Sequence, residues 1–294
     1  MRSRQFDWTN AVIVVSAHLM AVVGVVYMAA VNFSWPTVAL AAVWFWLCGL
    51  AITGGYHRLF AHPTYRAAWP LRALYLFFGA ASAQNSALKW SADHRVHHAL
   101  TDRDEDPYDI TRGFWWAHIG WIFFRRPEEG DLSKVRDMSA DPLMRLQHRF
   151  YVPLAIVAGG LLPAAIAGLW GDILGGLLVA GFLRLVVQWH ATFSINSVAH
   201  TLGERPYCAQ SSARDSWITA LLTLGEGYHN FHHRFQTDYR NGVRWFQFDP
   251  TKWFVWCMSK LALARDLRRA PPRAIERARE AARAERLARS GRAA

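Results

Sequence analysis

Asp93-His94-Arg95-Val96-His97-His98 is the stretch around which the rest of this chain is organised. Read as a helix, it places histidines at i, i+3 and i+4, so three imidazoles project from one face. The same H-x-x-H-H spacing returns downstream at His229, His232 and His233. Two such faces predict a histidine-rich metal site that holds more than one ion.

A third pair of histidines lies upstream, at His57 and His62. On a straight helix, residues at i and i+5 lie about 140° apart, so we expect this pair at a helix end, serving different metals. The remaining histidines outside the clusters have no metal-type spacing, and we interpret them as packing, interface or tautomer-ordering residues: His18, His118, His148 and His190.

The composition is that of a membrane protein. Of 294 residues, 52% are hydrophobic, and the chain has 15 Trp and 17 Phe. The three cysteines, Cys48, Cys208 and Cys257, have neither a disulfide-type nor a metal-type spacing. The histidines must therefore bind any metal without thiolate help.

Four apolar runs are long enough to cross a bilayer, and short turns join them into two hairpins. We predict spans at about 11–31, 37–53, 151–170 and 173–190. The first run also resembles a signal peptide, but it is too long and lacks a small-residue cleavage site. Residues 71–88 are a weaker candidate, because they contain Arg72, Gln84 and Asn85 and a span there would separate the histidine clusters. We expect a re-entrant or interfacial helix instead.

The charge pattern sets the orientation. The formal charge is +11, and nearly all Lys and Arg fall on the side that also carries the three histidine clusters. By the positive-inside rule this side is cytoplasmic, together with both termini. Nucleic-acid binding is not expected, because the basic residues flank apolar runs instead of alternating with aromatics. The Arg- and Ala-rich tail, residues 269–294, is expected to be a solvated or surface helix, with contact to anionic lipid as the alternative.

The histidine ligands limit which metal ions the site can bind. Neutral imidazole suits Zn, Cu, Fe and Ni, and eight histidines exceed the ligands of one zinc ion. The Glu-x-x-His pairs of soluble di-iron bundles are missing from these segments. We therefore predict an all-α integral membrane protein: four transmembrane helices in two hairpins and a cytoplasmic helical cap with a dinuclear iron site. Such a site would use O2 to attack a C–H bond of a lipid-like substrate.

Three segments carry a resemblance to a known family. They are similar to the histidine boxes of membrane fatty acyl desaturases, of the delta-9 stearoyl-CoA type: His57-Arg58-Leu59-Phe60-Ala61-His62, His94-Arg95-Val96-His97-His98 and Gly225-Glu226-Gly227-Tyr228-His229-Asn230-Phe231-His232-His233. The similarity runs from about residue 10 to 268, the expected catalytic domain being 1–268, and includes Asn196-Ser197-Val198-Ala199-His200 and Arg205-Pro206-Tyr207. It implies two iron ions and O2-dependent insertion of a cis double bond into an acyl chain, with CoA as the expected carrier.

The resemblance also assigns roles by position. It implies that the metal ligands are His57, His62, His94, His97, His98, His200, His229, His232 and His233, with Asn196 acting through a water. Gln84, Trp90 and Thr192 match positions at the bend of the acyl tunnel. Two departures from the family pattern are Ala92 in place of Arg and Phe193 in place of Trp. They leave Asp93, Arg125 and Arg126 as candidate headgroup contacts.

Carboxylates near the boxes are candidates to hold imidazole tautomers: Asp93, Asp106 and Glu226. The sequence shows neither a haem-domain pattern nor a Cys cluster, so the electron donor is expected to be separate, such as cytochrome b5, ferredoxin or rubredoxin with a reductase. Zinc can replace iron on purification, because imidazole accepts both.

Three alternatives remain at this point. Acyl-lipid desaturation and hydroxylation of an alkane or lipid use the same iron chemistry. A membrane zinc carrier would need a polar path through the spans, which offer only His18 and Arg184. The sequence therefore favours an enzyme.

Overall fold

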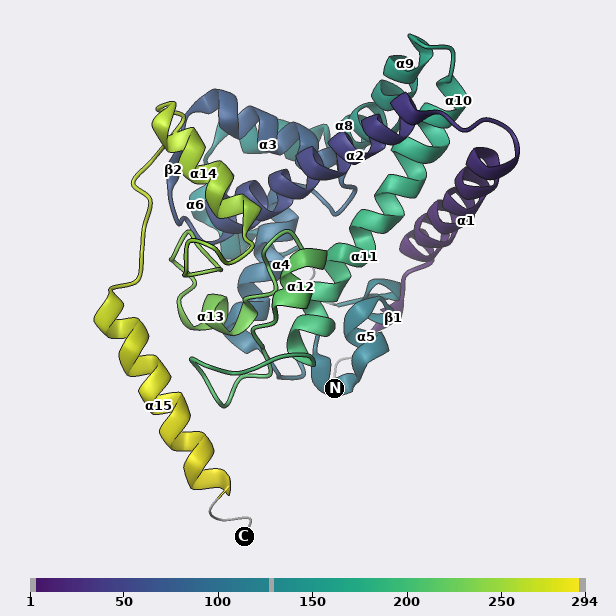
Figure 1. The fold of residues 1–294 in the computed structure, drawn as a ribbon. Coiled ribbons are helices and arrows are strands. Elements are labelled where there is room, and N and C mark those ends of the chain that lie inside the picture. Colours follow the sequence, from purple (N-terminus) through teal and green to yellow (C-terminus); the bar gives the residue numbers. More distant parts are fainter. Residues whose placement is uncertain (1–3, 127–129, 291–294) are drawn as a thin grey trace.

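The computed structural model describes residues 4–126 and 130–290, and the regular structure is almost all helical (Figure 1). Arg2 and the last four residues of the expected tail, 291–294, lie outside the described residues. Four helices are long and apolar enough to cross a membrane: Trp8–Ala30, Trp35–Ala61, Tyr151–Gly168 and Ile173–His200. The all-helical architecture with four candidate spans is as expected from the sequence.

Each candidate span is built from consecutive helical segments. The first is α1 (Trp8–Ala30), and the second is α2 (Trp35–Leu50) continued by the π-helical stretch Ala51–Ala61. The third is α8 (Tyr151–Ile156), the π-helical stretch Val157–Leu161 and α9 (Leu162–Gly168). The fourth is α10 (Ile173–Gly175), the π-helical stretch Gly176–Leu183, α11 (Arg184–Asn196) and the 3-10 turn Val198–His200.

The second and fourth spans continue as helix beyond their predicted ends at Thr53 and His190. Gly54 and Gly55, which follow the predicted end of the second span, let Tyr75 of α3 (Trp69–Ala81) pack directly on the helix. A Cβ on Gly55 would lie 2.6 Å from a Tyr75 atom. The helix therefore continues through the glycines and carries His57 beyond the apolar run, and the fourth helix carries His200 in the same way.

Buried polar groups hold the hairpins together. At the turn between the third and fourth spans, Asp172 accepts a hydrogen bond from the Tyr27 hydroxyl at 2.7 Å and another from the Thr37 hydroxyl. Arg184, expected to face protein and not lipid, is 3% exposed and donates to the Ala81 and Gly159 carbonyls at 3.1 and 3.0 Å. The charge in the span is thus covered by backbone acceptors.

The other helices form a cap at one end of the spans, and one of them, α3, also packs along the second and third spans. They are α3, α4 (Ala87–Leu100), α5 (Phe114–His118), α6 (Arg136–Ser139), α7 (Pro142–Arg149), α12 (Trp217–Leu222), α13 (His229–Arg234), α14 (Pro250–Lys260) and α15 (Pro272–Ser290). Two short antiparallel ladders tie the chain together, β1 (Gln5–Phe6) with β3 (Phe124–Arg125) and β2 (Arg66–Ala67) with β4 (Ala264–Arg265). Short 3-10 turns complete the cap at Ile110–Arg112, Gly120–Phe123 and Leu132–Val135.

Residues 71–88 and the C-terminal tail are the two segments for which the sequence analysis expected helices outside the spans. The 13-residue α3 covers much of 71–88 and is not among the candidate spans. The tail forms α15, which extends away from the body in Figure 1 and contacts it through Ile275 and Ala278, beside Tyr207 and Phe231.

Candidate functional site

Nine histidines gather into two groups where the cap meets the spans. In each group one ring nitrogen per histidine lies within 4.8 Å of all the others. One group has five members, His57, His62, His94, His98 and His232, and the other has four, His97, His200, His229 and His233. These are the nine histidines singled out by the family resemblance.

The H-x-x-H-H spacing explains how the groups lie side by side. On α4, the i and i+4 histidines, His94 and His98, belong to the five-histidine group, whereas His97 belongs to the four-histidine group. On α13 the division is reversed, because His229 and His233 join the four and the intervening His232 joins the five. Each helix therefore contributes to both groups.

The expectation that His57 and His62 serve different metals is wrong. They belong to the same group, and their ring centroids lie 5.0 Å apart. The reason is the π-helical stretch, in which the His62 N–H donates to the His57 carbonyl at 3.1 Å. A π-helix stacks residues i and i+5, which a straight α-helix would separate.

Ring nitrogens in the five-histidine group approach each other closely. The Nε2 atoms of His57 and His98 lie 2.9 and 3.0 Å from Nε2 of His232, and those of His62 and His94 lie 2.8 Å apart. Neutral imidazole offers one lone pair and one N–H, so several Nε2 atoms converging in this way form a ligand set more readily than a hydrogen-bond network.

Three histidines are oriented through Nδ1. His57 bonds to Glu226 and His97 to Asp106, each at 2.8 Å, while His200 bonds to the Ser212 hydroxyl at 2.5 Å. Ser212 in turn donates to Asp102. With Nδ1 as the donor, each ring presents a bare Nε2, and in His97 and His200 that atom is buried without a partner.

The electrostatics keep six of the grouped histidines neutral and the Glu226 carboxylate charged. Burial, together with neighbouring imidazoles, lowers the pKa far below its usual range for His62, His94, His98, His229, His232 and His233. Burial alone would raise the pKa of Glu226, but His57 and Arg58 outweigh it and lower that pKa to about 2. The Arg58 guanidinium and the Asn241 amide donate to Glu226 at 2.8 and 2.6 Å, so its carboxylate is firmly held.

These features fit two transition-metal ions with nitrogen ligands. Seven of the nine histidines are buried, and His98 and His233 are half-buried. Several of their nitrogens are buried without a hydrogen-bond partner: Nε2 of His97 and His200, and Nδ1 of His98 and His229. Imidazole-only sets suit iron, zinc, copper or nickel, so the donor set fits iron without selecting it.

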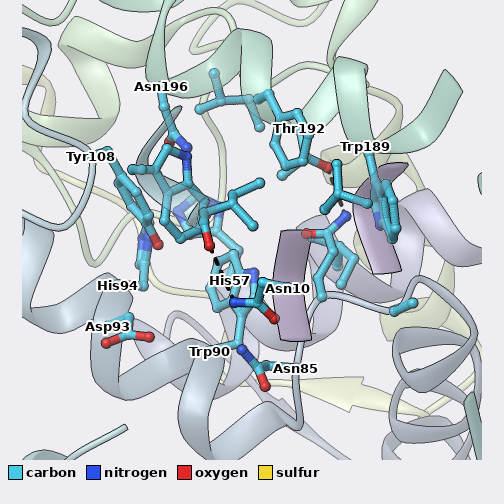
Figure 2. A pocket seen from close by; sticks show the side chains of 18 of the residues that line it. Asn10, His57, Asn85, Trp90, Asp93, His94, Tyr108, Trp189, Thr192 and Asn196 are labelled. Atoms are coloured by element: carbon cyan, nitrogen blue, oxygen red, sulfur yellow. Dashed lines mark hydrogen bonds between the residues drawn. The ribbon is translucent and has the colours of Figure 1, made fainter. Parts of the chain in front are cut away.

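An apolar pocket of about 530 Å³ reaches both groups (Figure 2). Its wall includes His57 and His94 of the five-histidine group and His229 of the four-histidine group. Most of the candidate substrate residues line it, namely Gln84, Trp90, Asp93, Arg126 and Thr192, and so does Asn196. The Gln84 amide donates to the Thr192 hydroxyl at 2.9 Å.

The remaining candidate headgroup residue lies elsewhere. Arg125 is not among the residues that line this pocket and instead pairs with Asp7 at 2.6 Å. Asp93 pairs with Arg126 at 2.6 Å, so it faces the pocket as half of an ion pair; of the three acidic candidates, Asp106 and Glu226 are the ones that bond to histidines.

Comparisons with known proteins show the family of this chain. The family model described as fatty acid desaturase matches residues 33–256. The chain belongs to the fatty acid desaturase family. It is 47% identical over 232 residues to acyl-CoA desaturase 1 of Saccharomyces cerevisiae, covering 78% of this chain and 46% of the yeast protein. It is 36% identical to stearoyl-CoA desaturase 5 of Bos taurus, covering 92% and 82% of the two chains, and 33% identical to the sn-1 stearoyl-lipid 9-desaturase of Anabaena variabilis, covering 90% and 94%.

This member of the family spans about half the length of its fungal relatives. Its matched region nevertheless contains the second, third and fourth candidate spans and all nine grouped histidines. Membership and the four spans together make the chain a membrane protein.

Some pocket residues of this desaturase-family chain were missed by the sequence analysis, among them Trp189, Tyr108 and Asn10. Trp189, Thr192 and Asn196 follow one another at i, i+3 and i+7 on α11, so helical spacing from Thr192 could have identified Trp189. Tyr108 and Asn10 carry no such signal, because tertiary folding alone brings their segments to the pocket.

The histidines outside the groups have structural partners. His18 contacts His190 at 3.1 Å, and His190 contacts His118 at 3.0 Å, a chain of rings that joins α1, α11 and α5. His148 bonds to the Ser86 hydroxyl at 2.7 Å, next to the start of α4. These contacts agree with the packing and interface roles expected for them.

Proposed function

We propose that this protein inserts a cis double bond, at carbon 9, into a saturated fatty acyl chain, using O2 and two iron ions held by the two histidine groups. The observation that carries the proposal is the apolar pocket whose wall includes histidines of both groups. The names of the relatives support a stearoyl-type chain and two carriers, CoA for the yeast and bovine proteins and a lipid for the cyanobacterial one. The CoA ester is the first carrier to test.

The reaction balances with an external electron donor. Two adjacent hydrogens of the chain, O2, two electrons and two protons become one double bond and two waters. Iron, when bound, supplies the power to activate O2 and remove hydrogen from an unactivated carbon. The electrons come from a separate carrier such as cytochrome b5, ferredoxin or rubredoxin with a reductase.

The side chains of the pocket select and position the chain. The apolar wall holds the methylenes and excludes water from the reacting carbons. The hydrogen-bonded pair Gln84 and Thr192 sets how far the chain can advance, and therefore which carbons face the histidines. Glu226 and Asp106 fix the rings of His57 and His97 through Nδ1.

The proposal includes an orientation and a domain division. The basic end with the histidine groups faces the cytoplasm, in accordance with the positive-inside rule. Residues 1–268 form the catalytic unit, and 269–294 are a basic tail.

A host that lacks unsaturated fatty acids provides the test. Expression of the wild type should produce a monoene with a cis double bond at carbon 9, located by gas chromatography and mass spectrometry. His97→Ala should abolish it and lower bound iron, whereas His18→Gln, outside both groups, should retain it. An iron-loaded protein with a compatible donor that yields no monoene would exclude desaturation.

A further inference from the structure

The pocket is open on the side of the helix bundle. Three large apolar residues of its wall are also more than half exposed, Ile13 on α1 at 52% and Val152 and Ile156 on α8 at 62% and 56%. Both helices begin candidate membrane spans. A side chain that lines a cavity and is also this exposed stands at an opening, so the cavity opens between α1 and α8.

The opening lies near the histidine-bearing end of the spans. Ile13 follows the start of α1 by five residues, or roughly 8 Å at a rise of about 1.5 Å per residue. Val152 and Ile156 belong to the first two turns of the third span, in α8. The opening is therefore at the depth where the upper part of an acyl chain lies in the adjacent leaflet.

The packing of α1 leaves this side uncovered. The helix lies at the edge of the bundle in Figure 1 and packs mainly on the fourth span. Its far half is in tight contact there, since a Cβ on Gly24 would lie 2.7 Å from the Leu178 carbonyl oxygen. The near half instead contributes Asn10, Ile13 and Val14 to the pocket wall.

The opening suits a neutral chain. Its exposed members on α1 and α8 are aliphatic, and Asn85 is an exposed but uncharged member of the same wall. Helix α11 provides Trp189 and Thr192 to the same cavity (Figure 2). Among the described lining residues the charged ones are Asp93, Arg126 and Glu226, and none of them belongs to α1 or α8. Arg126 is paired with Asp93 and Glu226 with Arg58.

We propose that Ile13, Val152 and Ile156 frame a lateral portal through which the acyl chain of a bilayer glycerolipid enters the pocket. Its headgroup stays at the interface while the saturated chain slides sideways to the histidine groups. The portal provides a route from the bilayer to the pocket for a lipid-borne chain, which a CoA ester arriving from water would not need. The chemistry at the end of this path rests on the proposed function, whereas the entry of the chain does not.

Photolabelling tests entry without turnover. The full chain is reconstituted in dioleoylphosphatidylcholine vesicles that contain a phosphatidylcholine with a diazirine in its saturated chain, and labelled peptides are mapped by mass spectrometry. The wild type should be labelled on α11 around Thr192. In Ile13→Trp/Val152→Trp that labelling should be lost, because the indoles fill the portal.

The matched control is Val12→Trp/Val157→Trp, which places the same two indoles at nearby exposed positions of the first and third spans. Val12 and Val157 are 61% and 45% exposed but do not line the pocket, so labelling of α11 should persist. The smaller change Ile13→Phe/Val152→Phe gives a second variant, and bound metal and the melting temperature report folding. Equal labelling in portal and control variants would overturn the proposal. Labelling by an aqueous acyl-CoA diazirine probe, with none from the lipid probe, would overturn it as well.

Failure of the portal and failure of the enzyme are distinguishable. Portal-dependent labelling in a protein that makes no monoene would leave the portal standing and reject the desaturase function. Monoene production without lipid labelling of α11 would reject the portal and leave the desaturase function standing. In an active protein, conversion of labelled phosphatidylcholine should fall in the portal variants and persist in the controls.

Discussion

At the residue scale, the site is organised by groups that touch histidines but not the reacting chain. The least obvious is Ser212, whose hydroxyl links the His200 imidazole to Asp102. Asp102 adopts a positive φ of 66°, a conformation that costs a non-glycine residue energy. The bonds it makes to the Ser212 hydroxyl and backbone N–H offset this cost.

Ser212→Ala should therefore weaken the four-histidine group specifically. Loss of the Nδ1 partner frees the His200 ring to rotate, and removal of such partners typically lowers metal affinity by about 10–100-fold. Competition with a chelator, with metal counted per protein, measures this. Ser211→Ala, at the adjacent hydroxyl, which bonds to the Ala213 N–H, is the control. Equal metal retention in both variants would contradict an orienting role for Ser212.

Thr192→Val should change the product and not the metal content. The substitution removes the hydroxyl that accepts from Gln84 but keeps the shape of the side chain. If this pair limits how far the chain advances, the double-bond position or preferred chain length should shift. Gas chromatography with double-bond location measures the product. A loss of iron as large as that in His97→Ala would show that Thr192 supports the metal site and not the pocket.

The sequence was enough to identify the histidines of the site, but not to assign each of them to one of the two groups. The spacings on α4 and α13 are local, so the sequence identified their histidines. Which ring joins which group depends on how the helices approach, and the assignment of His57 and His62 failed for that reason. Ser212 and Asp102 are 110 positions apart, and no local pattern joins them.

At the element scale, the π-helical stretch Ala51–Ala61 sets the register of the five-histidine group. Its wider turn brings His62 beneath His57, and Gly54 and Gly55 let α3 pack against it. From the sequence we expected the second span to end near Thr53 and His57 and His62 to lie at a helix end. Close packing of Tyr75 against Gly54 and Gly55 accompanies the continuation of the helix through both glycines, and this contact is visible only in the folded structure.

Gly55→Ala should destabilise the protein. The new Cβ would lie 2.6 Å from the Tyr75 Cβ, so either the stretch or α3 must shift, at a cost of about 1–3 kcal/mol, typical of overpacking. Thermal unfolding in detergent and metal content per protein should both decrease. Gly160→Ala is the matched control, since its Cβ would meet only a Leu177 side-chain atom at 3.6 Å. Equal melting temperatures for the two variants would refute the packing argument.

At the scale of the whole molecule, composition and the lengths of the apolar runs were enough to predict the helical architecture with four candidate spans. Four long apolar runs gave four candidate spans, because span length is fixed by bilayer thickness. The pocket was less accessible to sequence analysis. Its wall combines residues from Asn10 to His229, and only the packing of the spans against the cap brings them together.

The buried histidines also make the stability of the metal-free protein depend on pH. In the unfolded chain an imidazole binds a proton with a pKa of about 6.5. In the folded protein burial lowers the pKa well below that for His62, His94, His98, His229, His232 and His233. Below pH about 6.5 the unfolded state therefore binds more protons than the folded state, and stability falls. Glu226 acts in the same direction at lower pH, because its folded pKa of about 2 lies below the ordinary value of 4.5.

The melting temperature of the chelator-treated protein should thus decrease as pH falls from 7.5 to 5.5. Each buried histidine contributes at most about 1.4 kcal/mol per pH unit below its unfolded pKa, so several together make the decrease steep. His94→Leu replaces one such group with an apolar side chain that cannot be protonated, and it should flatten the profile. Burial lowers the pKa of His148 as well, but less far than that of His94, so His148→Leu, outside both groups, should flatten the profile less than His94→Leu does. A wild-type melting temperature that stays constant over this range would show that the grouped histidines are not held neutral by burial.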